Sequence, residues 1–323
     1  MSKLILATER GFVICKREGD AWREFARGLT DQRVTSAIAR EGTILAGTKK
    51  GILRSTDEGQ TWQEASHGLT TGHIRWMAAH PDIPGLRFAG TEPANIFVSQ
   101  HGGDSWRVCP EVAQLRDQFK WSLPYSPEAG CVRGFALHGS RSYAAVEVGG
   151  VLRSDDNGET WQLAEGSDGN PSFEGPPEPF VYPDVHSIEV HPSSPDLVYA
   201  PTGGGFYRSN DGGKTWTLFY DCYCRAVWVD PRDPEHLVLG PADYVDSNGR
   251  IEESRDGGQS WSAASNGLKV PWRRHMVERF LPVEDELLAV LSNGKVLGAP
   301  LSSLEWRPIL PGLANVNAMS NLF

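Results

Sequence analysis

Residues Arg208–Trp216 read RSNDGGKTW, and six other segments of the chain end in a similar way at a tryptophan. Four are close copies and two are degenerate: RSTDEGQTW ends at Trp62, VSQHGGDSW at Trp106, RSDDNGETW at Trp161, ESRDGGQSW at Trp261, VICKREGDAW at Trp22 and VLGAPLSSLEW at Trp306. The seven tryptophans are 40, 44, 55, 55, 45 and 45 residues apart. A repeat of this length is typical of one four-stranded propeller blade, so the sequence predicts seven blades.

Each repeat divides into short strands. In Val185–Trp216 the runs VHSIEVHP, DLVYAPT and GGFYRSNDGGKTW alternate apolar and polar residues and are broken by Pro, Gly and Asp. The N-terminal KLILATERGF aligns with TILAGTKKGI, which is a second and third strand, so the C-terminal LANVNAMSNL is expected to supply the missing inner strand. The prediction is an all-β fold: one domain over residues 1–323, a single seven-bladed β-propeller of four-stranded antiparallel blades, closed by pairing of the N- and C-terminal strands.

Bulk composition narrows the classes of function. The 323 residues include 41 Asp and Glu against 31 Lys and Arg, a net charge of −10, which argues against nucleic-acid binding because that needs a basic face. No apolar run approaches the length of a membrane span or a signal-peptide core, so no membrane contact is expected. Five cysteines form no disulfide-framework pattern. These features predict a reduced, cytoplasmic protein.

The repeated pattern S/T-x-D-x-G-x-T/S-W resembles the Asp-box, or BNR repeat, of sialidases, xyloglucanases, sortilin-type receptors and photosystem II assembly-factor propellers. The resemblance covers the chain from end to end and implies a sialidase-superfamily β-propeller. We expect the box aspartates, Asp57, Asp156, Asp211 and Asp256, to accept backbone N–H bonds in the turn between strands three and four. The tryptophan should pack beneath that turn on the outer rim. His101 replaces the aspartate in one copy, where a looser turn is predicted.

Residues that break the repeat are the candidates for function. Alignment of the second position of each inner strand brings together Thr35, Arg75, Arg133, His186, Arg225, His275 and Asn317. These side chains should meet where the channel opens. Three guanidinium groups in one small area are costly unless an anion or carboxylates compensate them.

The loops between strands two and three add further polar residues at the same mouth: Glu9, Lys49, Glu92, Glu147, Asp243 and Asn293. One interpretation is an anion-binding site in which Arg75, Arg133 and Arg225, helped by His73 and Lys49, hold a substrate. His186 or His275 would then act as acid or base, with Glu92, Glu147 or Asp243 as partner. The other interpretation is an internal salt-bridge network, which gives the same sequence pattern.

No cofactor is predicted. His73, His186 and His275, with Glu92 or Glu147, could ligate a divalent metal, but their spacing is no known ligand signature and a non-metal role is favoured. Cys222, Cys224 and Cys131 lie close to the predicted channel mouth, where buried free thiols are favoured over a soft-metal site.

Two long connections precede the fourth and fifth blades, Arg107–Gly130 and Glu165–Asp184. Long ordered loops often form lids or binding walls. Aromatic residues on them could stack on a sugar or could pin the loops to the rim: Trp121, Tyr125, Phe173 and Tyr182. Trp272, in VPWRRH, is expected on the same side.

The resemblance leaves two functions open. Sialidases carry an FRIP-type motif ahead of their first Asp-box, where this chain reads LATERGFVICKRE. Xyloglucanases resemble two propellers in tandem, and the assembly-factor propellers, which bind protein through an arginine patch, are similar in length. One hypothesis is a glycoside hydrolase-like or lyase enzyme acting on a small or oligomeric anionic substrate, such as a carboxylated sugar. The alternative is a non-catalytic propeller that binds a protein partner or ligand at the same face.

Overall fold

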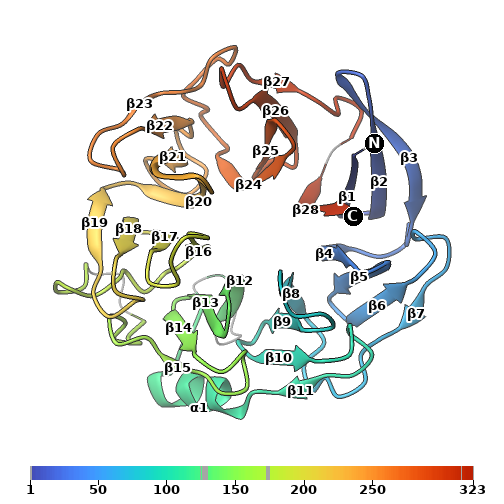
Figure 1. Cartoon of the computed structure of the whole chain (residues 1–323), viewed down its shortest axis with the longest axis horizontal. Coiled ribbons are helices and arrows are strands. Elements are labelled where there is room, and N and C mark those ends of the chain that lie inside the picture. Colours follow the sequence, from blue (N-terminus) through green and yellow to red (C-terminus); the bar gives the residue numbers. More distant parts are fainter. Residues whose placement is uncertain (1, 124, 126–129, 172–174, 314, 323) are drawn as a thin grey trace.

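The computed structural model describes residues 2–123, 125, 130–171, 175–313 and 315–322. Seven four-stranded antiparallel sheets surround a central channel, and each sheet has one edge strand beside the channel (Figure 1). The all-β, seven-bladed prediction is therefore confirmed. No helix in these ranges is long and apolar enough to cross a membrane.

Each blade runs from an inner strand at the channel to an outer strand at the rim. From the channel outward, the first blade holds β28 (Val316–Leu322), β1 (Lys3–Thr8), β2 (Gly11–Glu18) and β3 (Ala21–Gly28); the second, β4 (Val34–Arg40), β5 (Thr43–Thr48), β6 (Gly51–Ser55) and β7 (Gln63–Glu64); the third, β8 (Ile74–Ala79), β9 (Arg87–Thr91), β10 (Ile96–Ser99) and β11 (Arg107–Val108); the fourth, β12 (Cys131–His138), β13 (Arg141–Glu147), β14 (Gly150–Ser154) and β15 (Gln162–Leu163). The fifth holds β16 (Glu189–Val190), β17 (Val198–Thr202), β18 (Gly205–Ser209) and β19 (Thr217–Tyr220); the sixth, β20 (Tyr223–Asp230), β21 (Asp233–Ala242), β22 (Glu252–Ser254) and β23 (Ser262–Ala263); the seventh, β24 (Val277–Val283), β25 (Glu286–Leu291), β26 (Val296–Pro300) and β27 (Arg307–Pro308).

The two ends of the chain close the ring. The C-terminal β28 pairs antiparallel with the N-terminal β1, from Lys3 opposite Leu322 to Thr8 opposite Val316. The two termini lie side by side in the first blade in Figure 1. Closure gives β1 a second ladder partner beside β2 and completes the four strands of this blade.

The Asp-box turns have the predicted hydrogen bonds. In the fifth blade Asp211 Oδ1 accepts from the backbone N–H of Thr215 at 2.9 Å, and Oδ2 accepts from the Thr215 hydroxyl at 2.6 Å. Ser209 Oγ donates to Asp211 and accepts from the Gly213 N–H. The same set recurs at Asp57, Asp156 and Asp256, between the third and fourth strands of their blades.

Packing between blades uses small residues as well as the tryptophans. Gly47, Gly90 and Gly240 lie on second strands, and a Cβ on any of them would come within 2.6 Å of an Ile or Val at the start of the next inner strand. At the rim, the buried Trp106 and Trp306 donate their indole N–H to Ala65 and Ala264 of the preceding blade. The repeat therefore joins blades as well as closing turns.

One predicted loop contains a helix. Arg107–Gly130 includes α1 (Pro110–Phe119), which lies at the outer edge of the ring (Figure 1). Pro110 is at the start of α1, Glu111 lies in its first turn and Arg116 in its last, an arrangement that favours a helix. The interpretation of this segment as a loop was wrong, because these local signals were missed.

Candidate functional site

A cavity of about 210 Å³ opens at the channel mouth. Its wall is formed by Arg33, Thr35, Arg75, Trp76, Arg133, Glu278, Arg279, Leu291, Ser292, Val316 and Asn317. Four of these side chains carry guanidinium groups and one carries a carboxylate. The cavity is therefore a cationic one in a chain whose net charge is −10.

A β-bulge near the start of the inner strand positions most of these groups. In six blades the pairing of the inner strand with the second strand skips one or two residues there, so these have no ladder partner on the second strand. The skipped residues are Thr35, Arg75, Arg133, Arg225 with Ala226, Glu278 and Asn317. A bulge re-aims a side chain and ends local pairing. Five of these bulges contribute a residue to the cavity wall. The alignment that placed Arg75, Arg133 and Arg225 together thus found a real structural position.

The predicted position of His275 is wrong. β24 begins at Val277, so the equivalent bulged residue is Glu278, three positions later. His275 precedes the strand and stacks on Trp272, with ring centroids 5.1 Å apart. Burial, followed by the nearby Lys295, lowers the pKa of His275.

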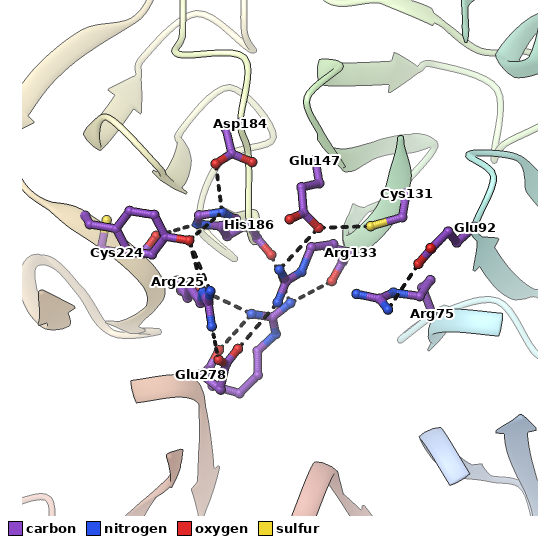
Figure 2. A network of polar contacts seen from close by, with 12 residues as sticks. Arg75, Glu92, Cys131, Arg133, Glu147, Asp184, His186, Cys224, Arg225 and Glu278 are labelled. Atoms are coloured by element: carbon purple, nitrogen blue, oxygen red, sulfur yellow. Dashed lines mark hydrogen bonds and ion pairs between the residues drawn. The ribbon is translucent and has the colours of Figure 1, made fainter. Parts of the chain in front are cut away.

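Glu278 links two of the arginines. Its Oε2 lies 3.4 Å from Arg133 Nη2, and its Oε1 accepts a hydrogen bond from Arg225 Nη1. Figure 2 shows the three side chains pointing toward one another across the channel. Burial opposes ionisation of Glu278, but Arg225 and Arg133 outweigh it and lower the pKa. The carboxylate is therefore charged at neutral pH and compensates part of the arginine repulsion.

Arg279 reaches across the channel and joins four blades. Its guanidinium donates to the backbone carbonyls of Arg133, His186, Arg225 and Glu278, at 2.7, 2.9, 3.1 and 2.7 Å. It also lies over the ring of Trp76 in the third blade, 4.6 Å from the centroid, so it contacts five blades in all. Burial and repulsion from Arg133 lower the pKa of Arg279 to about 9, which leaves it protonated at neutral pH.

A separate ion pair lies on the third blade. Arg75 Nη1 is 3.1 Å from Glu92 Oε2, and His73 Nδ1 is 3.8 Å from the same oxygen. Burial lowers the pKa of His73, Glu92 raises it, and the nearby cations Arg75 and Lys49 lower it further. Arg75 also lines the cavity described above, so its guanidinium lies between Glu92 and the cavity.

Glu147 is a buried carboxylate held by Arg133 and Cys131. Its Oε2 lies 3.3 Å from Arg133 Nη1 and accepts from the Cys131 thiol at 3.0 Å. Burial would raise the pKa of Glu147, but Arg133 and His186 outweigh it and lower the value to about 2. Burial also raises the pKa of Cys131, so this cysteine is a neutral, buried thiol, as predicted.

His186 is fully buried beside this carboxylate. Its Nδ1 lies 3.0 Å from the Cys224 carbonyl, and its Nε2 lies 3.1 Å from Asp184 Oδ2 and 3.3 Å from the Tyr223 hydroxyl. Tyr223 in turn accepts from Arg225. Glu147, Asp184 and His186 each place one ligand atom within 4.8 Å of the other two.

Several predicted site residues do not join this network. Trp121 is 2% exposed and donates its indole N–H to the Gly169 carbonyl, so the stacking role proposed for it is wrong. Asp243 is exposed, pairs with Arg250 at 3.1 Å and lines a different cavity with Tyr223 and Tyr244. Lys49 is exposed, Tyr182 packs over Gly204, and Trp272 is half-buried against His275. Tyr125 does meet the network: its ring is largely exposed, but a hydrogen bond from its side chain helps to lower the pKa of Glu147. Phe173 lies outside the described residues.

The sequence missed Glu278, Arg279, Asp184 and Tyr223. The run VERFLPV at 277–283 has the alternation of an inner strand, and aligning it with the other blades would have found Glu278. Asp184 ends the long connection Glu165–Asp184, which runs inward to the channel. Only the folded chain shows that this connection delivers a carboxylate to His186.

The BNR/Asp-box repeat family matches residues 152–163 and 207–218, so the chain is an Asp-box β-propeller. Xyloglucanase Xgh74A of Acetivibrio thermocellus is 26% identical over 222 residues, covering 56% of this chain and 25% of that protein. The oligoxyloglucan-reducing end-specific xyloglucanase of Emericella nidulans is 24% identical over 231 residues, covering 58% and 27%. The chain thus spans about a quarter of the length of these curated relatives.

Solved structures agree on the fold. An ancestral GH74 enzyme superimposes with a TM-score of 0.62 and 17% identity, over 90% of this chain and 38% of that one. YCF48 bound to D1 peptide gives a TM-score of 0.58 and 17% identity, over 88% and 84%. These similarities support the propeller fold alone.

Proposed function

We propose that this protein is a ligand-binding propeller whose cavity holds the carboxylate group of an anionic carbohydrate. The observation that carries the proposal is the cavity wall, where Arg33, Arg75, Arg133 and Arg279 face one carboxylate, Glu278. Arg33 and Arg75 each use one nitrogen on a carboxylate of their own, Glu9 and Glu92. Their other N–H groups suit the paired hydrogen bonds that a guanidinium makes to a carboxylate.

Binding without hydrolysis fits the channel best. A glycosidase needs a carboxylic acid that keeps its proton near neutral pH. Glu147 and Glu278 have lowered pKa values because they are paired with Arg133 and Arg225. Both are poor proton donors at neutral pH. Carbohydrate is the proposed ligand class because the curated relatives that match are named as xyloglucanases.

A glycoside hydrolase-like enzyme is the second candidate. It is supported by the same two relatives and by Glu189, on β16. The surrounding protein raises the pKa of Glu189 to about 7, with Arg279 offsetting part of the rise, although its side chain stays open to solvent. A cytoplasmic location stays a prediction.

The test is isothermal titration of the purified protein with glucuronate, galacturonate and N-acetylneuraminate, and with glucose as the neutral control. Acidic sugars should bind and glucose should not. Arg75→Gln should weaken binding at least tenfold, as expected for the loss of about 1.4 kcal/mol or more from a charged hydrogen bond. Arg107→Gln is the matched control, because Arg107 lies on the outer strand of the same blade, away from the cavity, and also pairs with a carboxylate, Glu159.

Equal binding of glucose, or an unchanged affinity in Arg75→Gln, would contradict the proposal. Release of reducing sugar from acidic oligosaccharides, lost in Glu189→Gln, would favour the enzyme. Binding of acidic peptides in place of sugars would instead identify a protein partner.

A further inference from the structure

The group formed by Glu147, Asp184 and His186 lies beside the arginine cavity and is not part of its wall. It gathers residues from two neighbouring blades at the channel mouth, and Figure 2 shows Asp184 in contact with His186 while Glu147, beside them, contacts Arg133 and Cys131. The three ligand atoms lie within 4.8 Å of one another. From its hydrogen bonds we propose that this group is a binding site for one divalent transition-metal ion.

The first argument is the tautomer of His186. The Cys224 carbonyl can only accept, so Nδ1, at 3.0 Å, must carry the hydrogen. A neutral ring therefore presents a lone pair on Nε2, and that lone pair faces Asp184 Oδ2 at 3.1 Å. Two electron pairs at this distance repel unless a proton or a metal ion lies between them. The Nδ1–H···O=C bond is also the usual way in which a protein orients a metal-binding histidine.

The second argument concerns Asp184. Its Oδ1 is buried and has no hydrogen-bond partner, which is costly for a carboxylate oxygen. The Tyr223 hydroxyl offers one hydrogen to Nε2 at 3.3 Å, but this contact leaves Asp184 facing the ring without a bridging proton. A proton on Nε2 satisfies one acceptor on that side of the ring. A metal ion satisfies the imidazole and both carboxylates together.

The third argument is that the ligands are already held in place. Glu147 Oε2 accepts from Cys131 and lies against Arg133, so the carboxylate is fixed by groups outside the cluster. Gly203 borders Asp184, where a Cβ would come within 2.4 Å of Oδ2. Two carboxylates offset the charge of a divalent ion, which would compete with Arg133 for Glu147, 3.3 Å away. One imidazole with two carboxylates suits Zn²⁺ or Mn²⁺, with coordination completed by water.

The proposal is tested on full-length protein stripped with chelator and titrated with ZnCl₂ and MnCl₂ by calorimetry, with the Mn²⁺ electron paramagnetic resonance signal as a second readout. One ion per chain should bind, and the melting temperature should rise with metal concentration. Asp184→Asn should weaken binding at least tenfold. Glu92→Gln is the matched control, because Glu92 is also a buried carboxylate beside a histidine and an arginine, His73 and Arg75, but no third ligand joins them in the described part of the chain.

Nitrogen-15 NMR of the histidine side chains in the wild-type protein needs no variant to fold. On metal addition the His186 Nε2 should change to a metal-bound shift while Nδ1 stays protonated. Substoichiometric or absent binding at millimolar metal would overturn the proposal. So would binding that Asp184→Asn leaves unchanged, or an Nε2 that stays protonated at saturating metal; the cluster would then be a buried imidazolium between two carboxylates.

Discussion

The outer turns and the channel mouth belong to the same repeat, but the residues of the turns are alike between blades and those of the mouth differ. At the rim, Asp57, Asp156, Asp211 and Asp256 accept the same hydrogen bonds in four blades. At the mouth, the bulged position of the inner strand is occupied by threonine, arginine, glutamate or asparagine, depending on the blade. Each rim turn is held by hydrogen bonds between residues no more than four apart, so the same residues can serve in each blade. The mouth has one axis, and its residues must complement one another.

The range of the interactions shows the same contrast. Asp211 bonds to residues at 209–215. Arg279 bonds to Arg133 and His186, which are 146 and 93 residues away in the chain. Loss of a rim bond should therefore affect one turn, whereas loss of an axial bond should affect several blades together.

Arg279→Met should have the largest effect. It removes the donor that serves four backbone carbonyls and leaves Glu278 with fewer compensating cations. We expect a loss of roughly 3 kcal/mol or more in the free energy of unfolding, measured by urea denaturation. The control is Arg273→Met, an exposed arginine near the same strand, which should change stability by about 0.5 kcal/mol or less. Equal effects of the two substitutions would show that the bonds of Arg279 across the channel do not stabilise the ring.

Asp211→Ala should have an intermediate effect. The box loses the bonds from Lys214, Thr215 and Ser209, but the blade keeps its tryptophan Trp216, which is 3% exposed. We expect a loss of about 1–2 kcal/mol by the same denaturation measurement. A loss as large as that of Arg279→Met would show that the rim turns are coupled between blades.

His101→Asp should give a small gain. The third blade keeps the Ser99 hydroxyl bond to the Gly103 N–H at 3.0 Å but lacks the box carboxylate. An aspartate at this position has the spacing to Ser105 that Asp211 has to Thr215. A stability gain of about 0.5–1 kcal/mol is expected. The same substitution at His67, outside any box, should give no gain.

The smallest effect is in the pH dependence of one rim turn. Hydrogen bonds from Thr61 and Ser55 lower the pKa of Asp57 from 3.8 to about 2. Because the folded value is the lower one, the stabilisation is complete above pH 4 and is lost as the pH falls from 4 to 2. The difference in stability between the wild-type protein and Asp57→Asn should shrink over that range. A difference that is constant down to pH 2 would contradict the assignment.

The candidate site was predictable only in part. Arg75, Arg133 and Arg225 were found because they share a position within the repeat, and that position is the bulge. His275 was misplaced because VPWRRH interrupts the repeat just before β24. The sequence left Trp121 open between a stacking role and a role in pinning the loop, because an aromatic residue on a long connection gives no sign of its burial.

The sequence by itself determined the number of blades, the closure of the ring and the Asp-box turns. These follow from periodicity and from hydrogen bonds between residues close in the chain. The tertiary structure alone decided that Glu278 pairs with Arg133 and Arg225, that Arg279 spans the channel and that Asp184 meets His186. The first two depend on how blades far apart in sequence converge, and the third on the path of one long connection, so no local pattern encodes them.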